Sequence, residues 1–293
     1  MSEERDDKNA PAGWAALSSF GRNPVTAVGV VVLAVYFLAA VFAGLIAPRD
    51  PQKTSRESFR PPSAEHLFGT DDLGRDVFSG VVHGARVSLV MGFAVALLSV
   101  LVGVLVGSAA GYAGGLADDL LMRLTEVFII PPRFFLALVV AALFGSNYVN
   151  LAAVLVVTYW PSTARLVRAE VLSLKERGYV EAARALGAGH ARLLFHAILP
   201  NASPLIVTNF VMMVGMVVLV EAGLSFVGLG DSSHVSWGYM LHNGEHFMRD
   251  AWWMMFFPAL AISLLVLALN AVGDALNRAL DPKTRIAQPG KAT

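Results

Sequence analysis

Residues 179–201 read YVEAARALGAGHARLLFHAILPN and form the longest polar passage in the second half of a very apolar chain. Residues 181–186 and 191–199 favour helix, while Gly187 and Gly189 interrupt the pattern between them. Pro200 is expected to end the second helix. The stretch therefore predicts two short helices joined by a glycine turn, forming a compact knob that lies outside a membrane.

The composition of the chain is that of a membrane protein. Of its 293 residues, 56% are hydrophobic and only 15% are charged, whereas soluble domains average about 25% charged residues. A helical span needs about 20 apolar residues, so the chain has room for several. The formal net charge of zero argues against a nucleic-acid partner, and the absence of cysteine removes disulfides and thiolate chemistry.

Six membrane spans are expected, which makes the fold class all-α and integral to the membrane. Pro131 and Pro132 lie in the third span and are expected to kink or break it, because each removes a backbone donor. A polar turn is expected at residues 118–123, and Trp252 and Trp253 suit an aromatic belt at the membrane interface. The expected spans are residues 25–47, 86–118, 124–145, 151–166, 203–227 and 251–272.

A stripe of glycines recurs every four residues in the second span, at positions 103, 107, 111 and 115. This spacing puts the four on one helix face, where a neighbouring helix can approach closely. Close packing is the favoured interpretation, and a flexible gate is the alternative.

The distribution of basic residues orients the chain. Of 22 Lys and Arg residues, 14 fall on the side that holds both termini and the 179–201 stretch, 7 fall on the other side, and Arg133 lies within a span. Basic loops stay in the cytoplasm, so we expect a multi-pass protein with both termini cytoplasmic.

The pattern Glu181-Ala182-Ala183, with Gly187 four residues later, resembles the "EAA" loop of permease subunits from bacterial ATP-binding-cassette (ABC) importers. Residues 66–89, 225–230, 236–241 and 270–282 resemble the branch of that family that carries dipeptides, oligopeptides or nickel, and within it the C-type subunit. The resemblance implies a type I ABC importer permease fold with a cytoplasmic coupling helix. It also implies residence in the bacterial cytoplasmic (inner) membrane.

The same resemblance implies the partners and the division of the chain. The partners are a second homologous permease, two ATPase subunits or domains, an extracytoplasmic solute-binding protein and membrane lipid. The chain carries no phosphate-binding loop, so ATP and Mg²⁺ are expected on the ATPases, with no cofactor and no catalytic residue in this chain. The expected parts are residues 1–85 (a cytoplasmic lead, the first span and an extracytoplasmic loop), the permease domain at 86–277 and a cytoplasmic tail at 278–293.

Contact with the ATPase is assigned by this resemblance to Glu181, Ala182, Ala183, Leu186 and Gly187. The alanines keep the helix slim enough to enter a cleft, Leu186 offers an apolar anchor, and Glu181 can form charged hydrogen bonds. Gly187 permits a sharp turn that other residues resist. The implied function is ATP-driven import by alternating access, with peptide as the first choice of cargo and nickel or another small solute as the alternative.

Two intramembrane charges support an alternative from another class, an ATP-independent secondary transporter. Arg133 beside the proline pair and Glu221 in the fifth span could line a pathway, because charges within membranes are costly and usually functional. For Glu221, hydrogen bonding between helices is the favoured interpretation. That alternative leaves the EAA pattern unexplained.

One fragment fits an enzyme signature. Residues 242–246 spell H-x-x-E-H, the inverted zinc-protease motif. A catalytic zinc needs a third protein ligand and a rigid helix beneath the histidines, but Gly244 lies between them in a short loop. No metal site is expected.

Overall fold

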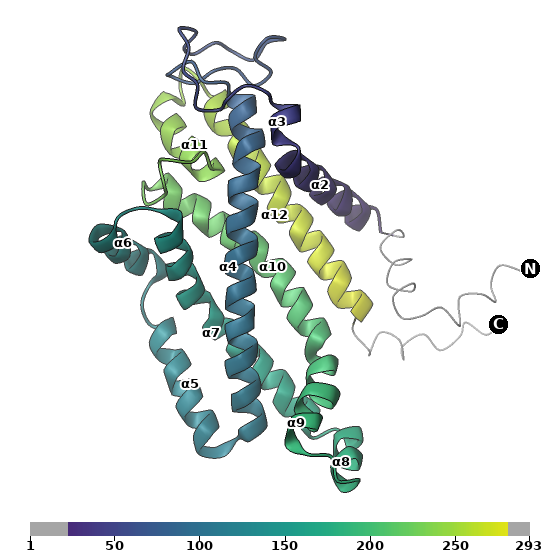
Figure 1. Cartoon of the computed structure of the whole chain (residues 1–293). Coiled ribbons are helices and arrows are strands. Elements are labelled where there is room, and N and C mark those ends of the chain that lie inside the picture. Colours follow the sequence, from purple (N-terminus) through teal and green to yellow (C-terminus); the bar gives the residue numbers. More distant parts are fainter. Residues whose placement is uncertain (1–22, 281–293) are drawn as a thin grey trace, which may run out of the picture.

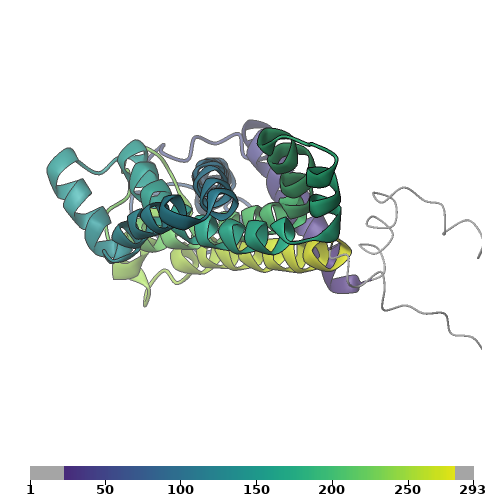
Figure 2. The same cartoon turned by 90° about the horizontal axis from the view of Figure 1, so that it is seen from below.

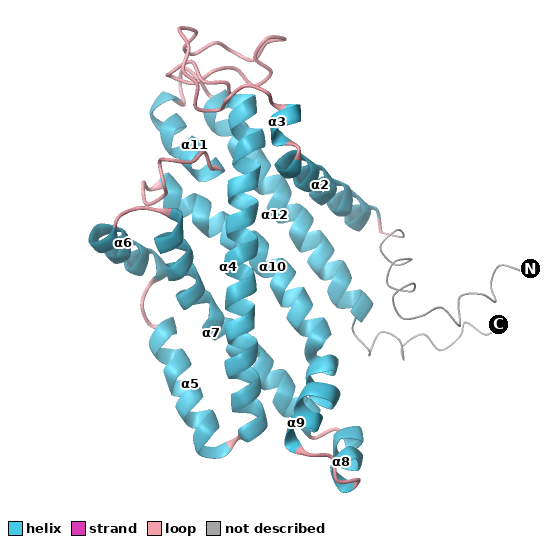
Figure 3. Cartoon of the chain, viewed as in Figure 1, coloured by secondary structure: helices cyan, strands magenta, loops and turns pink. Residues whose placement is uncertain are grey.

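The computed structural model describes residues 23–280, and within them the chain is helical (Figure 3). No β-strand occurs in that range, where only an isolated bridge joins Thr70 and Asp76. The all-α prediction is therefore confirmed for the described residues. The polar lead at residues 1–22 and the tail from residue 281 lie outside them.

The elements are α2 (Pro24–Val41), α3 (Ala43–Ile46), α4 (Val77–Ala113), α5 (Gly115–Ile129), α6 (Arg133–Phe144), α7 (Tyr148–Lys175), α8 (Gly178–Ala185), α9 (His190–Arg192), the π-helix η2 (Leu193–Ile198), α10 (Leu199–Phe226), α11 (Trp237–Gly244), the 3₁₀-helix η3 (Glu245–Phe247) and α12 (Trp253–Leu280).

Helix α4 runs through the centre of the molecule, and the other long helices pack around it (Figure 1). Figure 2 views the molecule nearly along α4, with α5 and α6 to one side and α8 to the other. The main core joins buried side chains of α4, α7, α10 and α12, among them Val95, Leu155, Val217 and Leu265. The loop 47–76 covers one end of α4, and α8 lies toward the opposite end (Figure 1).

Four helices are long and apolar enough to cross a membrane: α2, α4, α12 and the continuous run His190–Phe226, which contains α9, η2 and α10. A fifth span is formed if α5 and α6 count together, as two halves that bend by 74°. The bend lies at the proline pair, between Ile129 and Arg133, as predicted. The predicted fourth span forms α7, but α7 is too polar to pass the same test, so the number six stays a prediction.

The glycine stripe packs α4 against α7. A Cβ on Gly103 would lie 2.5 Å from Thr163 Cβ, one on Gly107 would overlap the carbonyl oxygen of Ala164, and one on Gly111 would lie 2.8 Å from a carbonyl oxygen of α7. Gly115 does not belong to this stripe, because it lies beyond the end of α4 at φ +54 with open space around it. The packing interpretation is thus confirmed for three of the four glycines.

Three local expectations were wrong. The turn expected at residues 118–123 lies earlier, at Gly114 and Gly115, which both have positive φ and end α4; residues 118–123 are helical in α5. Pro200 does not end a helix, because the π-helix η2 precedes it and Pro200 lies in the first turn of α10, where a missing N–H costs little. The expected aromatic belt is wrong for Trp253, which is buried and donates from Nε1 to the carbonyl of Thr70 at 3.0 Å, whereas the half-exposed Trp252 remains compatible with it.

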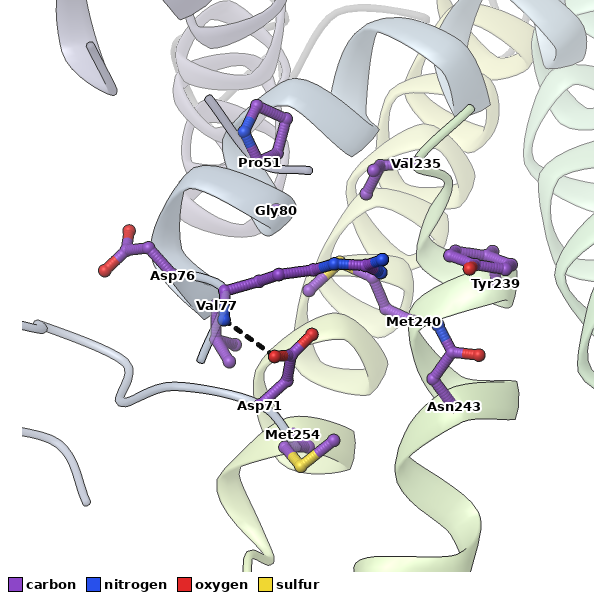
Figure 4. A pocket seen from close by; sticks show the side chains of 11 residues that line it. Pro51, Asp71, Asp76, Val77, Gly80, Val235, Tyr239, Met240, Asn243 and Met254 are labelled. Carbon is purple, nitrogen blue, oxygen red and sulfur yellow. Dashed lines mark hydrogen bonds between the residues drawn. The ribbon is translucent and has the colours of Figure 1, made fainter. Parts of the chain in front are cut away.

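The loop 47–76 is fixed to the start of α4 and to α11 and α12. Asp76 caps α4 by accepting from the N–H of Ser79, and its other oxygen lies 2.8 Å from Nδ1 of His66. Figure 4 shows the cavity of about 30 Å³ between this loop and the two helices, with Asp71 on one side and Tyr239 and Asn243 on the other. Burial raises the pKa of Asp71.

Candidate ATPase-coupling site

The EAA segment, defined here as residues 178–189, projects from the end of the bundle opposite the loop 47–76 (Figure 1). Helix α8 contains Glu181, Ala182 and Ala183, as the sequence predicted. The segment is anchored by Val180, whose side chain is fully buried among Val171, Leu174 and Leu193. Apolar contacts on the inner face, made by Val180 and by the partly buried Ala183 and Ala188, therefore hold the segment, and its outer face is exposed.

The turn after α8 has the geometry of a Schellman motif. Gly187 adopts φ +85, its N–H donates to the carbonyl of Arg184, and the N–H of Ala188 donates to the carbonyl of Ala183, both at 3.0 Å. This pattern satisfies the last carbonyl groups of the helix and needs a left-handed residue at its turn, which glycine supplies at least cost. The predicted role of Gly187 in the turn agrees with this geometry.

The exposed residues of the segment form a surface beside a hollow. Glu181, Ala182 and Gly187 are exposed, and Leu186 is 89% exposed although it is apolar. A hollow of about 330 Å³ follows the turn, lined by Ala183, Leu186, Gly187, Ala188, Arg192, Leu193, His196 and Ala197. An exposed leucine beside a concave surface with basic groups suits a protein partner better than solvent.

The sequence did not single out Arg192 and His196 as site residues. They follow the glycine turn by five and nine residues, and they reach the hollow because α9 and η2 fold back along α8. Tyr179 and Phe195 are also exposed aromatic residues of this region, at 44% and 60%. Their exposure could not be read from the sequence, since an apolar residue next to a long span is normally assigned to the core.

Arg133 and Glu221 belong to different elements. Arg133 is the first residue of α6, directly after the proline pair. Glu221 lies in α10 and is fully buried, and its Oε1 accepts from the hydroxyls of Ser225, at 2.7 Å, and Ser236, at 3.3 Å. Because Ser236 caps α11, Glu221 joins two helices, which was the favoured interpretation of this residue. A role of either residue in a pathway remains a prediction.

The H-x-x-E-H fragment does not form a zinc site in the described residues. Nδ1 of His242 lies 2.8 Å from the carbonyl of Phe226, and His246 is exposed and paired with the adjacent Glu245. The one group of described residues close enough to share a metal ion is Glu57, Glu65 and His66 in the loop 47–76. His242 and His246 are not among them.

The helices and the projecting EAA segment are those of an all-helical membrane permease with the type I ABC importer fold, as two comparisons show. A chain of the inward-facing structure of the MetNI methionine ABC transporter aligns with a TM-score of 0.57, covering 69% of this chain and 96% of that one at 21% identity. Residues 103–286 match the family of binding-protein-dependent transport system inner membrane components, and residues 14–62 match the N-terminal membrane domain of oligopeptide transport permease C. The chain belongs to this family of ABC transporter permeases.

Curated relatives resemble the chain over nearly its whole length. A putative peptide transport system permease protein of Brucella suis is 42% identical over 88% of both chains. The dipeptide transport system permease protein DppC of Escherichia coli is 40% identical over 97% of this chain and 100% of its own. The oligopeptide transport system permease protein OppC of Bacillus subtilis is 36% identical over 96% and 93%. Proteins of this kind are the membrane components of their transporters, and the chain is accordingly a non-catalytic subunit.

Proposed function

We propose that this chain is the membrane-spanning subunit of an ATP-driven importer that carries peptides into the cytoplasm. The names of the relatives, which include dipeptide and oligopeptide permeases, support peptide over nickel as cargo. The histidines give no support to a dedicated nickel path. The one potential metal-binding group in the described residues lies in the loop 47–76 and outside the apolar helices.

The machine would contain a second, related permease, two ATPase subunits or domains and an extracytoplasmic solute-binding protein. ATP and Mg²⁺ would be bound by the ATPases, since this chain has no phosphate-binding loop. The membrane would be the bacterial inner membrane, with both termini and the EAA segment in the cytoplasm. Closure and opening of the ATPases would displace the EAA segment and switch the pathway between outward-facing and inward-facing states.

The observation that carries the proposal is the exposed, Schellman-closed EAA segment with Leu186 beside the hollow. A slim helix with Ala182 and Ala183 on its surface can enter a cleft, and Leu186 would provide the apolar anchor that interfaces need. Glu181 and Arg192 can form charged hydrogen bonds at the rim. The turn at Gly187 is closed by its own hydrogen bonds, so docking costs little ordering entropy.

The test is Gly187→Asp in the complex reconstituted in proteoliposomes with its ATPases and binding protein. Nothing lies within 4 Å of a Cβ at this position, so the chain should still fold and insert. The positive φ and the added charge beside Leu186 should weaken docking. We expect binding-protein-stimulated ATP hydrolysis and peptide uptake to fall at least tenfold, with insertion unchanged.

Gly187→Asn serves as the matched control, because asparagine has the shape of aspartate and a similar tolerance of positive φ but carries no charge. Its cost of about 1 kcal/mol should give an intermediate loss. Normal uptake in Gly187→Asp would refute the assignment of the EAA segment. A purified chain that moves solute in ATP-free liposomes would refute the importer and favour the secondary transporter.

A further inference from the structure

Tyr112, in the last turn of α4, holds both ends of the EAA segment. Its hydroxyl lies 2.9 Å from Nδ1 of His190, the first residue after the segment. Its carbonyl accepts from Nζ of Lys175 at 2.7 Å, and the same ammonium group lies 5.7 Å from the centre of its ring. Lys175 is the last residue of α7, three positions before α8. One residue of α4 is therefore bonded to the chain three residues before the start of the EAA segment and one residue after its end.

A second connection lies beside the first. Arg168 of α7 donates from two nitrogens to the two carboxylate oxygens of Asp118, at 2.5 and 2.6 Å. Asp118 belongs to α5, which follows α4 after the turn at Gly114. A two-bond pair of this kind fixes orientation as well as distance. The ends of α4 and α7 and the start of α5 are thereby held in one arrangement.

The contact between α4 and α7 is too close to allow sliding. At Gly103, Gly107 and Gly111 the backbones approach so closely that not even a methyl group fits without displacement. Interdigitated cores move as units and do not deform continuously. A displacement of the segment that reaches Tyr112 should therefore move α4 and α7 together.

Helix α4 can carry such a displacement across the membrane. It contains 37 residues without a proline, which corresponds to a length of about 55 Å. Its first turn is capped by Asp76, which contacts His66 and Arg49 of the loop 47–76. The bonds at Tyr112 and those at Asp76 thus lie at opposite ends of one rigid helix.

We propose that Tyr112, Lys175 and His190 form a coupling clasp, through which movement of the EAA segment is passed to α4 and thus to the extracytoplasmic loop 47–76. Tyr112 is a positioning residue in this scheme, since it acts through the segment and touches neither ATP nor cargo. The inference rests on the proposed function, in which the EAA segment docks on an ATPase. It adds the helix that receives the movement.

The experiment compares Tyr112→Phe with Tyr36→Phe in the reconstituted complex. Tyr36 offers a matched control, because its hydroxyl also donates a 2.9 Å hydrogen bond to another helix, to the carbonyl of Ala261, far from the EAA segment. We expect Tyr112→Phe to assemble and to keep basal ATPase activity, while the peptide transported per ATP falls about two- to thirtyfold, the range that coupling mutations span. Tyr36→Phe should leave this ratio unchanged.

A double-mutant cycle separates the clasp from general damage. If the hydroxyl acts through His190, Tyr112→Phe should have no further effect on the ratio in a His190→Ala background. An unchanged ratio in Tyr112→Phe, an equal fall in Tyr36→Phe, or full additivity with His190→Ala would each overturn the proposal.

Hydrogen exchange of the purified chain gives a second readout that needs no ATPase. Tyr112→Phe should speed exchange of amides at residues 176–193, because the segment loses one of its two attachments to α4, and Tyr36→Phe should not. Unchanged exchange there would contradict the clasp even if the importer is confirmed. Faster exchange in the purified Tyr112→Phe chain would support the clasp as a structure. If ATP hydrolysis by the reconstituted wild-type complex did not respond to the binding protein, the proposed function would be refuted separately.

Discussion

The close contact between α4 and α7 makes a direct prediction about Gly107. A Cβ built at this position would overlap the carbonyl oxygen of Ala164 and lie 3.0 Å from its carbonyl carbon. Backbone atoms cannot turn away as a side chain can, so in Gly107→Ala the two helices must separate locally. Overpacking of this kind costs about 1–3 kcal/mol. Dispersion contacts that are lost where the two helices separate add to this cost.

Two opposing effects decide the net change. Alanine gains up to about 1 kcal/mol over glycine in a helix, so the gain offsets part of the steric cost. Gly44→Ala is the control without a steric clash, because Gly44 lies in the short helix α3 with nothing within 4 Å of its Cβ position. We expect the free energies of unfolding of the two variants to differ by about 2–3 kcal/mol, with Gly107→Ala the less stable.

The assay is the apparent unfolding midpoint in detergent at a fixed scan rate, since membrane proteins of this size often unfold irreversibly. At about 2–4 °C per kcal/mol, Gly107→Ala should unfold roughly 4–12 °C below Gly44→Ala. Gly111→Ala, whose Cβ would lie 2.8 Å from the carbonyl oxygen of Arg168, should fall between them. Equal midpoints for Gly107→Ala and Gly44→Ala would show that α4 and α7 are not closely packed. The inference that α4 and α7 move together in the clasp would then be refuted as well.

Further predictions concern the other buried polar groups. Glu221→Ala should lower the free energy of unfolding by about 1–3 kcal/mol, because it leaves two buried hydroxyls without an acceptor, whereas Glu221→Gln keeps an acceptor and should cost less; equal losses in thermal unfolding would contradict this. Trp253→Phe keeps an aromatic side chain but removes the indole N–H and leaves the carbonyl of Thr70 unpaired. Hydrogen exchange at residues 57–76 should therefore rise, and unchanged exchange would refute the anchoring role. Burial alone would raise the pKa of Asp76, but hydrogen bonds from His66 and the first turn of α4 hold it below its usual range. The higher stability of wild type relative to Asp76→Asn should therefore be fully present above about pH 4 and decrease as the pH falls toward the pKa of Asp76 in the folded state. A difference between their unfolding midpoints that does not change with pH would contradict the assignment.

Local features of the sequence predicted local features of the structure. The EAA helix, the left-handed glycine at position 187 and the break at the proline pair each follow from neighbouring residues, whose conformational preferences act over a few positions. The glycine spacing predicted a close contact but not its partner, because α7 begins 35 residues after α4 ends. Pro200 shows the limit of such rules. A proline is expected to interrupt a helix, but here the π-helix η2 precedes it and the helix continues through this position.

The residues of the proposed clasp could not be found from the sequence. Tyr112 and His190 are 78 positions apart, and Tyr112 and Lys175 are 63 apart. Neither pair belongs to a periodic pattern or a motif. Their meeting depends on the packing of α4 against α7, so it becomes visible only in three dimensions. The hollow beside the EAA segment could not be predicted from the sequence either, because Arg192 and His196 reach it only through the way α9 and η2 fold.

The polarity of α7 has a structural cause that bears on the number of spans. Thr158, Ser162 and Arg165 recur at helical spacing, so they lie on one face, and they line a hollow of about 310 Å³ beside Pro131. The face that packs on α4 is made of buried small and apolar residues such as Ala164, Val167 and Val171. Polar groups within a membrane are tolerated where they face a water-filled space and not lipid. This face accounts for part of the low hydropathy of α7, and charged residues outside the hollow, such as Arg168 and Lys175, account for more.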